Sequence, residues 1–294
     1  MSRIALNALL ALALAGCTRA QVAEPASAPP PPAEPRVPAS MQWLYGSGEG
    51  AAAGIQAYHA FRDHVLAAAR SRPAESVVLA EGSTLDAPRF VPCGERPLAV
   101  VLDVDETAIQ NLGYEYDEAQ RGLVYDQGRW NRWEQTGANA VAPIPGAVTA
   151  LRAVREAGVT VIFNSNRQAI NAAQSAAAIE GAGLGPARHG ETLYLQGDVV
   201  PGSAKDPRRA AVASRYCVVA MAGDQLGDFS DLFNVRSLSV TDRRSAASSG
   251  RFASLWGNGW FMLSNPVYGP SIRGGFDDVF PADKRWSDPQ GGQE

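Results

Sequence analysis

Two aspartates one residue apart, Asp103 and Asp105, directly follow an apolar run in this chain. A carboxylate can attack the phosphorus of a phosphate ester once charge is neutralised, and a second acid can protonate the leaving oxygen. Lys205 offers a neutralising ammonium, and Ser165 with Asn166 offers donors for phosphate oxygens. These are the residue types that transfer of a phosphoryl group requires.

The elements that would position these residues alternate between apolar runs and amphipathic segments. We expect strands at 97–104, 159–163, 192–195 and 216–222, and helices at 55–65, 145–157, 169–179 and 205–214. Apolar strands separated by helices indicate a parallel sheet covered on both faces. Such a sheet binds ligands beyond the carboxyl ends of its strands, which is where the candidate residues lie.

A second pair of acids, Asp224 and Asp228, follows the last expected strand. At the shared edge of the sheet these acids would lie near Asp103 and Asp105, and such a cluster repels itself unless a hard cation lies within it. The sequence therefore predicts a divalent metal site beside Asp103 and Asp105.

Each motif taken alone has a simpler interpretation. Asp-x-Asp at a strand end can bind calcium or cap a helix, and the later acids can be solvated loop residues. Ser165 can be a helix cap, and Lys205 can be a solvated residue in a first helical turn. The order of all four motifs, each at the matching end of an element, favours a common site.

In this order the motifs resemble those of haloacid dehalogenase (HAD) superfamily phosphohydrolases. Over about residues 41–286 the chain more narrowly resembles the class C bacterial acid phosphatases, the outer-membrane lipoprotein acid phosphatase/5′-nucleotidase family. The segments that carry the resemblance are Asp-Val-Asp-Glu-Thr from Asp103, Ser-Asn-Arg from Ser165, Lys205 with Arg208 and Arg209, Gly-Asp-x-Leu-x-Asp-Phe from Gly223, and Phe261 to Gly269. The resemblance implies an α/β fold: a HAD-like Rossmannoid parallel sheet flanked by helices, with a small, mainly helical, cap-like addition.

The resemblance also implies roles for the catalytic and phosphate-binding residues. Asp103 would be the nucleophile that forms an aspartyl phosphate, and Asp105 would protonate the leaving oxygen and later deprotonate water. Ser165, the backbone amide of Asn166 and Lys205 would hold the phosphate oxygens. Lys205 would also keep Asp103 ionised.

A Mg²⁺ cofactor is implied in the same way. Its ligands would be the Asp103 carboxylate, the Asp105 backbone carbonyl and Asp224, while Asp228 would orient a metal-bound water. Many relatives are expected to carry a further acid at the position of Gly227, and this departure puts the metal affinity in question.

Aromatic residues gather on both sides of the motifs, and Tyr114 and Tyr268 are our candidates for substrate binding. Aromatic rings stack nucleobases, and the resemblance implies nucleoside monophosphates as the small phosphomonoester substrate. The alternative is that these rings pack an irregular cap against the core.

The N-terminus predicts export and lipid anchoring. Residues 1–16 have the pattern of a lipoprotein signal peptide, and Leu14 to Cys17 resemble a bacterial lipobox, which makes Cys17 the lipidation site. A plain secretory signal is the alternative. We expect residues 17–40 to be a Pro-rich tether, residues 41–286 the phosphatase domain and residues 287–294 a flexible tail. The expected location is the cell envelope, lipid-anchored to the outer membrane of a Gram-negative bacterium.

Composition excludes one class of partner and leaves one pairing open. The chain has 294 residues and a formal net charge of −4 without a long basic run, so a nucleic acid polymer is not expected as its ligand. Cys93 and Cys217 either form a disulfide, as is common in oxidising compartments, or stay as two buried thiols. The three histidines show no metal-binding spacing.

Two functions of different classes fit these observations. The first is a Mg²⁺-dependent acid phosphatase or 5′-nucleotidase at the cell envelope. The second is a non-catalytic surface lipoprotein that uses the same fold for ligand binding or adhesion. An acid pair spaced as nucleophile and proton donor favours the enzyme, because a binding protein needs neither.

Overall fold

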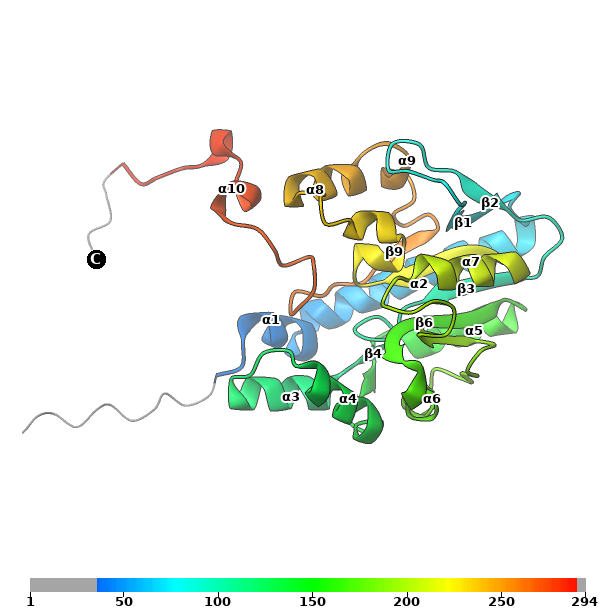
Figure 1. The fold of residues 1–294 in the computed structure, drawn as a ribbon, viewed down its shortest axis with the longest axis horizontal. Helices are drawn as coiled ribbons and strands as arrows, with labels where there is room; N and C mark the ends of the chain where they lie inside the picture. The colour runs from blue at the N-terminus through cyan, green and yellow to red at the C-terminus, as the bar shows by residue number, and fades with distance from the viewer. Residues whose placement is uncertain (1–35, 290–294) are drawn as a thin grey trace, which may run out of the picture. The chain divides into compact units, whose positions relative to one another are not determined.

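A computed structural model describes residues 36–289, and a five-stranded parallel sheet lies at its centre (Figure 1). The strands occur in the order β7-β6-β3-β8-β9, with all neighbours parallel. Their bounds are Leu98–Leu102 for β3, Thr160–Gln168 for β6, Leu193–Gln196 for β7, Cys217–Gly223 for β8 and Trp260–Met262 for β9. The predicted α/β class with a parallel sheet is confirmed.

The strand order places a ligand crevice beside β3. The chain passes from β3 to β6 and β7 on one side, and then returns to the other side of β3 for β8 and β9. This reversal makes the junction of β3 and β8 a topological switch point, where open parallel sheets form their crevice. The residues that follow β3 and β8 are the two aspartate pairs.

Helices cover both faces of the sheet because β3 is apolar on both sides. Val100 and Leu102 belong to one buried cluster, and Ala99 and Val101 belong to a second, as the two-residue period of a strand requires. The first cluster is completed by α2 (Gly48–Ser71), α5 (Ala147–Glu156) and α6 (Ala172–Gly181). The second is completed by α7 (Asp206–Arg215), η4 (Asp231–Asn234) and α9 (Gly250–Ala253).

Two elements are longer than the sequence predicted. The helix expected at 55–65 runs over all of α2, and Ser47 caps it by accepting a hydrogen bond from Gly50 N at 2.9 Å. The strand expected at 159–163 continues through Gln168. It does so because β7 pairs with β6 beyond Phe163, with an irregularity between Asn164 and Gln168. The helix expected from 169 begins as a 3₁₀ turn, and α6 starts at Ala172.

The cap-like addition consists of α3 (Leu112–Arg121) and α4 (Gln127–Thr136). The short antiparallel pair of β4 (Ile109–Gln110) and β5 (Ala142–Pro143) closes its base. Buried Glu134 on α4 accepts hydrogen bonds from Asn171 Nδ2 at 2.7 Å and Gln168 N at 3.1 Å. These hydrogen bonds therefore join the cap to the segment that connects β6 with α6.

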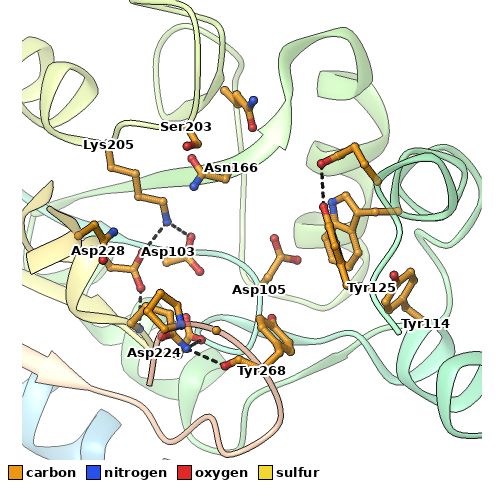
Figure 2. A pocket seen from close by; sticks show the side chains of 18 of the residues that line it. Asp103, Asp105, Tyr114, Tyr125, Asn166, Ser203, Lys205, Asp224, Asp228 and Tyr268 are labelled. Atoms are coloured by element: carbon orange, nitrogen blue, oxygen red, sulfur yellow. Dashed lines mark hydrogen bonds and ion pairs between the residues drawn. The ribbon is translucent and has the colours of Figure 1, made fainter. Parts of the chain in front are cut away.

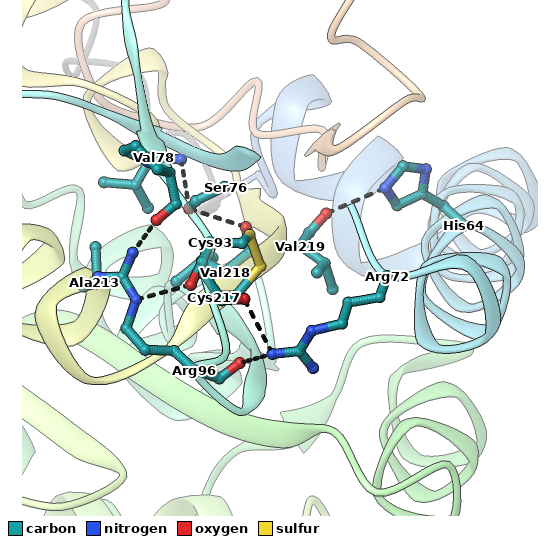
Figure 3. Close-up of a disulfide and its surroundings, with 12 residues drawn as sticks. His64, Arg72, Ser76, Val78, Cys93, Arg96, Ala213, Cys217, Val218 and Val219 are labelled. Atoms are coloured by element: carbon teal, nitrogen blue, oxygen red, sulfur yellow. Dashed lines mark hydrogen bonds between the residues drawn. A yellow bond between two sulfur atoms is a disulfide. The ribbon is translucent and has the colours of Figure 1, made fainter. Parts of the chain in front are cut away.

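A disulfide and buried hydrogen bonds hold the amino-terminal end of β8 (Figure 3). Cys93, just after the hairpin of β1 (Glu75–Leu79) and β2 (Phe90–Pro92), is bonded to Cys217 with 4.7 Å between their Cα atoms. Arg96 donates to the carbonyl oxygens of Cys93 at 3.0 Å and Ala213 at 2.5 Å. Ser76 donates to Val218 O at 3.0 Å. This end of the sheet is thus crosslinked to the hairpin.

The remaining elements are short. They are α1 (Ala39–Met41), the π-helical turn η1 (Gln42–Gly46), η3 (Leu226–Asp228), α8 (Val240–Ser248), α10 (Phe276–Val279) and η5 (Ala282–Lys284). Within residues 36–289 no helix has both the length and the apolar character needed to cross a bilayer. The signal peptide, Cys17, most of the tether and residues 290–294 lie outside the described residues, so these assignments and the segment boundaries stay predictions.

Candidate active site

The predicted catalytic residues line one pocket at the carboxyl end of the sheet (Figure 2). The pocket has a volume of about 610 Å³. Asp103 and Asp105 reach it from the end of β3, Asn166 from β6, Lys205 from the start of α7, and Asp224 from the end of β8. The structure therefore brings together segments that are separated by more than a hundred residues.

Lys205 bridges two of the carboxylates. Its Nζ donates a hydrogen bond to Asp103 Oδ1 and another to Asp228 Oδ1 at 2.6 Å, and all three side chains are buried. The pKa of Asp103 is raised to about 7, because burial and the charges of Asp228 and Asp105 together outweigh the opposing effect of Lys205. Burial alone would lower the pKa of Lys205, but Asp103 and Asp228 raise it above its ordinary value. The ammonium is therefore charged and fixed.

Asp224 completes a group of three buried acids. Oxygen atoms of Asp103, Asp224 and Asp228 all lie within 4.8 Å of one another. Burial, and next the charges of Asp228 and Asp103, raise the pKa of Asp224 well above its ordinary value. Asn265 Nδ2 at 2.8 Å and Thr107 Oγ1 at 3.2 Å donate to Asp224 and fix its orientation.

This donor set fits a hard divalent cation. Three carboxylates face one ammonium, so negative charge remains in a buried place, and the ligand atoms are all oxygen. Nitrogen or sulfur ligands, which softer metals prefer, are absent from this group of described residues. The Asp105 side chain is outside this group, and the expected use of its backbone carbonyl stays a prediction.

Asp105 is held by Arg167, a residue to which the sequence analysis gave no role. Arg167 donates to Asp105 Oδ1 from Nη2 at 2.7 Å and from Nε at 2.9 Å, and Asn111 Nδ2 donates to the same oxygen at 3.0 Å. Oδ2 has only longer contacts, 3.3 Å each, to Ser165 Oγ and Arg167 Nε. Oδ2 is therefore the less tightly held of the two oxygens. Residues two apart on a strand lie on the same face, so the spacing of Ser165 and Arg167 could have indicated that both contact Asp105.

The two predicted phosphate-binding residues of β6 occupy different positions. Asn166 lines the pocket, and its Oδ1 accepts a hydrogen bond from Arg208 Nη2 at 2.5 Å. Ser165 is fully buried and does not line the pocket; its hydroxyl donates to Asp105 and accepts from Arg167 N at 3.0 Å. In this structure Ser165 thus contacts Asp105, and its contact with a phosphate stays a prediction.

Glu106 is a buried centre of hydrogen bonds that sequence reasoning treated only as part of a motif. It has a left-handed backbone, with φ of 52°, which is uncommon for a residue other than glycine. Asn111 N donates to its Oε1 at 2.8 Å, and the hydroxyl groups of Tyr45 and Tyr268 donate to Oε1 and Oε2. Tyr45 and Tyr268 are 61 and 162 residues away in the chain, so no local pattern could reveal these contacts.

Residues 54–271, most of the chain, match the family model described as HAD superfamily, subfamily IIIB (acid phosphatase). The chain belongs to this acid phosphatase family.

Solved structures agree with this assignment. The class C acid phosphatase from Bacillus anthracis is similar with a TM-score of 0.62 and 25% identity, covering 79% of this chain and 84% of that one. A crystal structure of the Bacillus anthracis enzyme with tungstate bound has a TM-score of 0.62 and 22% identity, covering 85% and 91%. The predicted HAD-like fold and the class C resemblance are confirmed, and the protein is a phosphomonoesterase.

Both tyrosines that were predicted to bind substrate line the pocket of this acid phosphatase, together with Tyr125 and Trp130. The Tyr114 ring packs edge-on against Trp130, with 4.9 Å between centroids, and Arg129 lies 4.3 Å over its face. Figure 2 shows Tyr268 on the side of Asp224, opposite Tyr125 and Tyr114. Aromatic groups therefore flank the space above the acids of the phosphatase.

Gly227 occupies the position where an acid was expected in many relatives, and its surroundings explain the glycine in this phosphatase. A Cβ at Gly227 would lie 2.1 Å from Asn234 Nδ2, so Asn234 fills the space into which a side chain would extend. A Cβ at Gly223 would likewise lie 2.3 Å from Asp228 Cβ. The carboxylates of Asp224 and Asp228 remain in place without a further acid.

Proposed function

We propose that this acid phosphatase hydrolyses nucleoside monophosphates with Mg²⁺ through an aspartyl phosphate at Asp103, and that it works at the cell envelope. The observation that carries the proposal is the bridge from Lys205 to Asp103 and Asp228 beneath a pocket with aromatic walls. An ammonium that touches the nucleophile lets a carboxylate approach a phosphate dianion.

Asp103 forms the new bond to phosphorus. Lys205 occupies Oδ1, and Oδ2 has no hydrogen-bond partner among the described residues, so Oδ2 is our nucleophilic atom. Its lone pair attacks phosphorus, and the ester oxygen leaves with the electrons of the broken P–O bond. The resulting acyl phosphate is more reactive than the ester, which divides one difficult hydrolysis into two displacements.

Asp105 moves the protons. Its Oδ2 protonates the departing alkoxide, and the same oxygen then takes a proton from the water that attacks the aspartyl phosphate. Phosphate leaves, and Asp103 is regenerated as a carboxylate. Arg167 and Asn111 hold Oδ1 throughout, so the donor oxygen keeps its direction toward the pocket.

The acid cluster would hold Mg²⁺. Asp103 and Asp224 with the Asp105 backbone carbonyl would be the protein ligands, and Asp228, already paired with Lys205, would orient a ligand water. When bound, the ion neutralises charge on the phosphate and on these acids.

The aromatic residues support a nucleotide substrate. Tyr268 and Tyr125 present rings to the pocket that holds the catalytic acids, and stacking a base is worth about 1–3 kcal/mol. We expect AMP to have a lower KM than p-nitrophenyl phosphate, with activity lost on chelation and restored by Mg²⁺. Equal KM values would remove the nucleotide preference. Absence of phosphate release from either ester would instead favour the non-catalytic surface lipoprotein.

Two features support an envelope location. The lipobox pattern ending at Cys17 predicts a lipid anchor, and the Cys93–Cys217 disulfide is of a kind that persists in oxidising compartments. The full chain should fractionate with outer membranes, and the Cys17→Ser variant should not acquire lipid. Equal distribution of the two proteins would contradict the anchor.

A further inference from the structure

A second pocket with a strongly basic lining adjoins the active site. It has a volume of about 730 Å³ and lies between η4, α8 and the segment after Tyr268. Four arginines line it, and no aspartate or glutamate does: Arg236, Arg243, Arg244 and Arg273. Asn234, Pro270 and Arg273 line both pockets, so the two pockets are direct neighbours.

The charges of these arginines are unpaired within the part of the chain that the structure describes. Within residues 36–289 no ion pair joins any of the four to a carboxylate. Arg243 donates from Nε to Phe233 O at 3.1 Å, whereas its Nη2 is buried without a partner. Burial, and then the like charge of Arg273, lower the pKa of Arg243. Positive charge of this density, in a chain of net charge −4, is stabilised by a bound anion.

We infer that the arginine pocket binds a second phosphate of the substrate, so that phosphomonoesters with two phosphate groups bind more tightly than those with one. Guanidinium groups match phosphate oxygens in pairs, which favours a phosphate over a single carboxylate as the ligand. One phosphate would contact Lys205 while the other lies among the arginines. This inference rests on the phosphatase activity and extends the proposed substrate class.

The test uses the full chain and two substrate pairs. Inhibition constants against p-nitrophenyl phosphate hydrolysis are measured for adenosine 3′,5′-bisphosphate and AMP, and for fructose 1,6-bisphosphate and fructose 6-phosphate. We expect each bisphosphate to inhibit at least about tenfold more tightly than its monophosphate, the effect of one or two charge-assisted hydrogen bonds. The sugar pair has no base, so its ratio does not depend on the nucleotide preference.

The key variant is R236Q/R244Q, because both side chains are exposed and make no hydrogen bond that holds the fold. It should remove the advantage of both bisphosphates. The matched control R188Q/R251Q removes the same charge from exposed arginines that do not line the pocket, and it should keep the advantage. Equal binding of mono- and bisphosphates by the natural protein would overturn the inference. So would an advantage that survives R236Q/R244Q or that the control variant also loses.

Failure of the proposed nucleotide preference has a different signature. In that case AMP binds no more tightly than fructose 6-phosphate, whatever the ratios between bisphosphates and monophosphates. The two experiments thus separate recognition of the base from recognition of the second phosphate.

Discussion

The two ends of the central sheet are stabilised in opposite ways. At the carboxyl end, three buried acids lie together beside one ammonium, and burial, followed by the charges of neighbouring acids, raises the pKa values of Asp103 and Asp224. At the amino end, a disulfide and the hydrogen bond from Ser76 to Val218 O join β8 to the β1–β2 hairpin. The first arrangement is reactive and electrostatically strained, whereas the second is inert and crosslinked.

This difference separates the region on which activity depends, the carboxyl end of the sheet, from the region that stabilises the fold, the amino end. Groups that repel one another at an active site commonly reduce stability, and removing one can stabilise the fold while it removes activity. We therefore expect changes at the carboxyl end to affect turnover more than unfolding, and changes at the amino end to do the reverse.

The largest expected effect is that of Asp103→Asn. Without a carboxylate to attack phosphorus, kcat should fall by at least about 10³-fold, while relief of repulsion should leave the melting temperature unchanged or higher. Phosphate release and thermal unfolding measure the two effects, with the exposed Asp86→Asn as the matched control. Substantial turnover by Asp103→Asn would disprove the nucleophile assignment.

The next effect is on stability, at the other end of the sheet. Cys93→Ser/Cys217→Ser opens a disulfide that spans 124 residues, so the free energy of unfolding should fall by roughly 4 kcal/mol. Because the bond is remote from the acids, kcat should change by less than about twofold at temperatures where the variant is folded. A large loss of kcat together with an unchanged denaturation midpoint would reverse the comparison.

A smaller effect on turnover is expected for Arg167→Lys. Lysine keeps the charge but loses the paired contacts to Asp105, so kcat on AMP should fall by on the order of 50-fold. p-Nitrophenyl phosphate has a good leaving group that needs little protonation, so its kcat should fall less. Equal losses on both substrates would show that Arg167 does not act through the proton donor.

The smallest expected effect concerns Glu115, which is buried at the pocket wall. Burial, and next Glu106 and Glu118, raise its pKa to about 8 from an ordinary 4.5. The folded state therefore binds the proton more strongly, and this contribution to stability is complete below pH 4.5 and is lost as the pH rises toward 8. Glu115→Gln should be more stable than the natural protein at pH 8 by on the order of 2 kcal/mol, with the difference vanishing near pH 4.5. Urea titrations at both pH values measure this, and a pH-independent difference would contradict it.

Much of the fold was predictable because it depends on local patterns. Apolar runs identified β3 and β8, and the acids directly after them identified the edge of the sheet where the pocket lies. Strand β6 was predicted too short, because its last residues are polar and are kept extended by pairing with β7. A pairing partner 30 residues away in the chain does not change the local hydrophobic periodicity from which strands are predicted.

The charged residues of the site were predictable from the sequence, but the residues that hold them in position were less so. Lys205 contacts Asp103 as the motif order implied. The roles of Arg167 and Glu106 depend on side chains from other elements, such as Tyr45 near the start of the described chain and Tyr268 near its end. Such hydrogen bonds follow from the tertiary fold, whereas the sequence shows only that polar residues are present.

The Cys93–Cys217 bond also determines what happens when the chain is cut. Residues 199–204, between β7 and α7, are exposed and lie inside the covalent ring. A protease that cleaves there leaves two fragments joined through sulfur, each with part of the catalytic set. Nicked molecules should therefore migrate as one species on a non-reducing gel and separate into two only when a thiol is added.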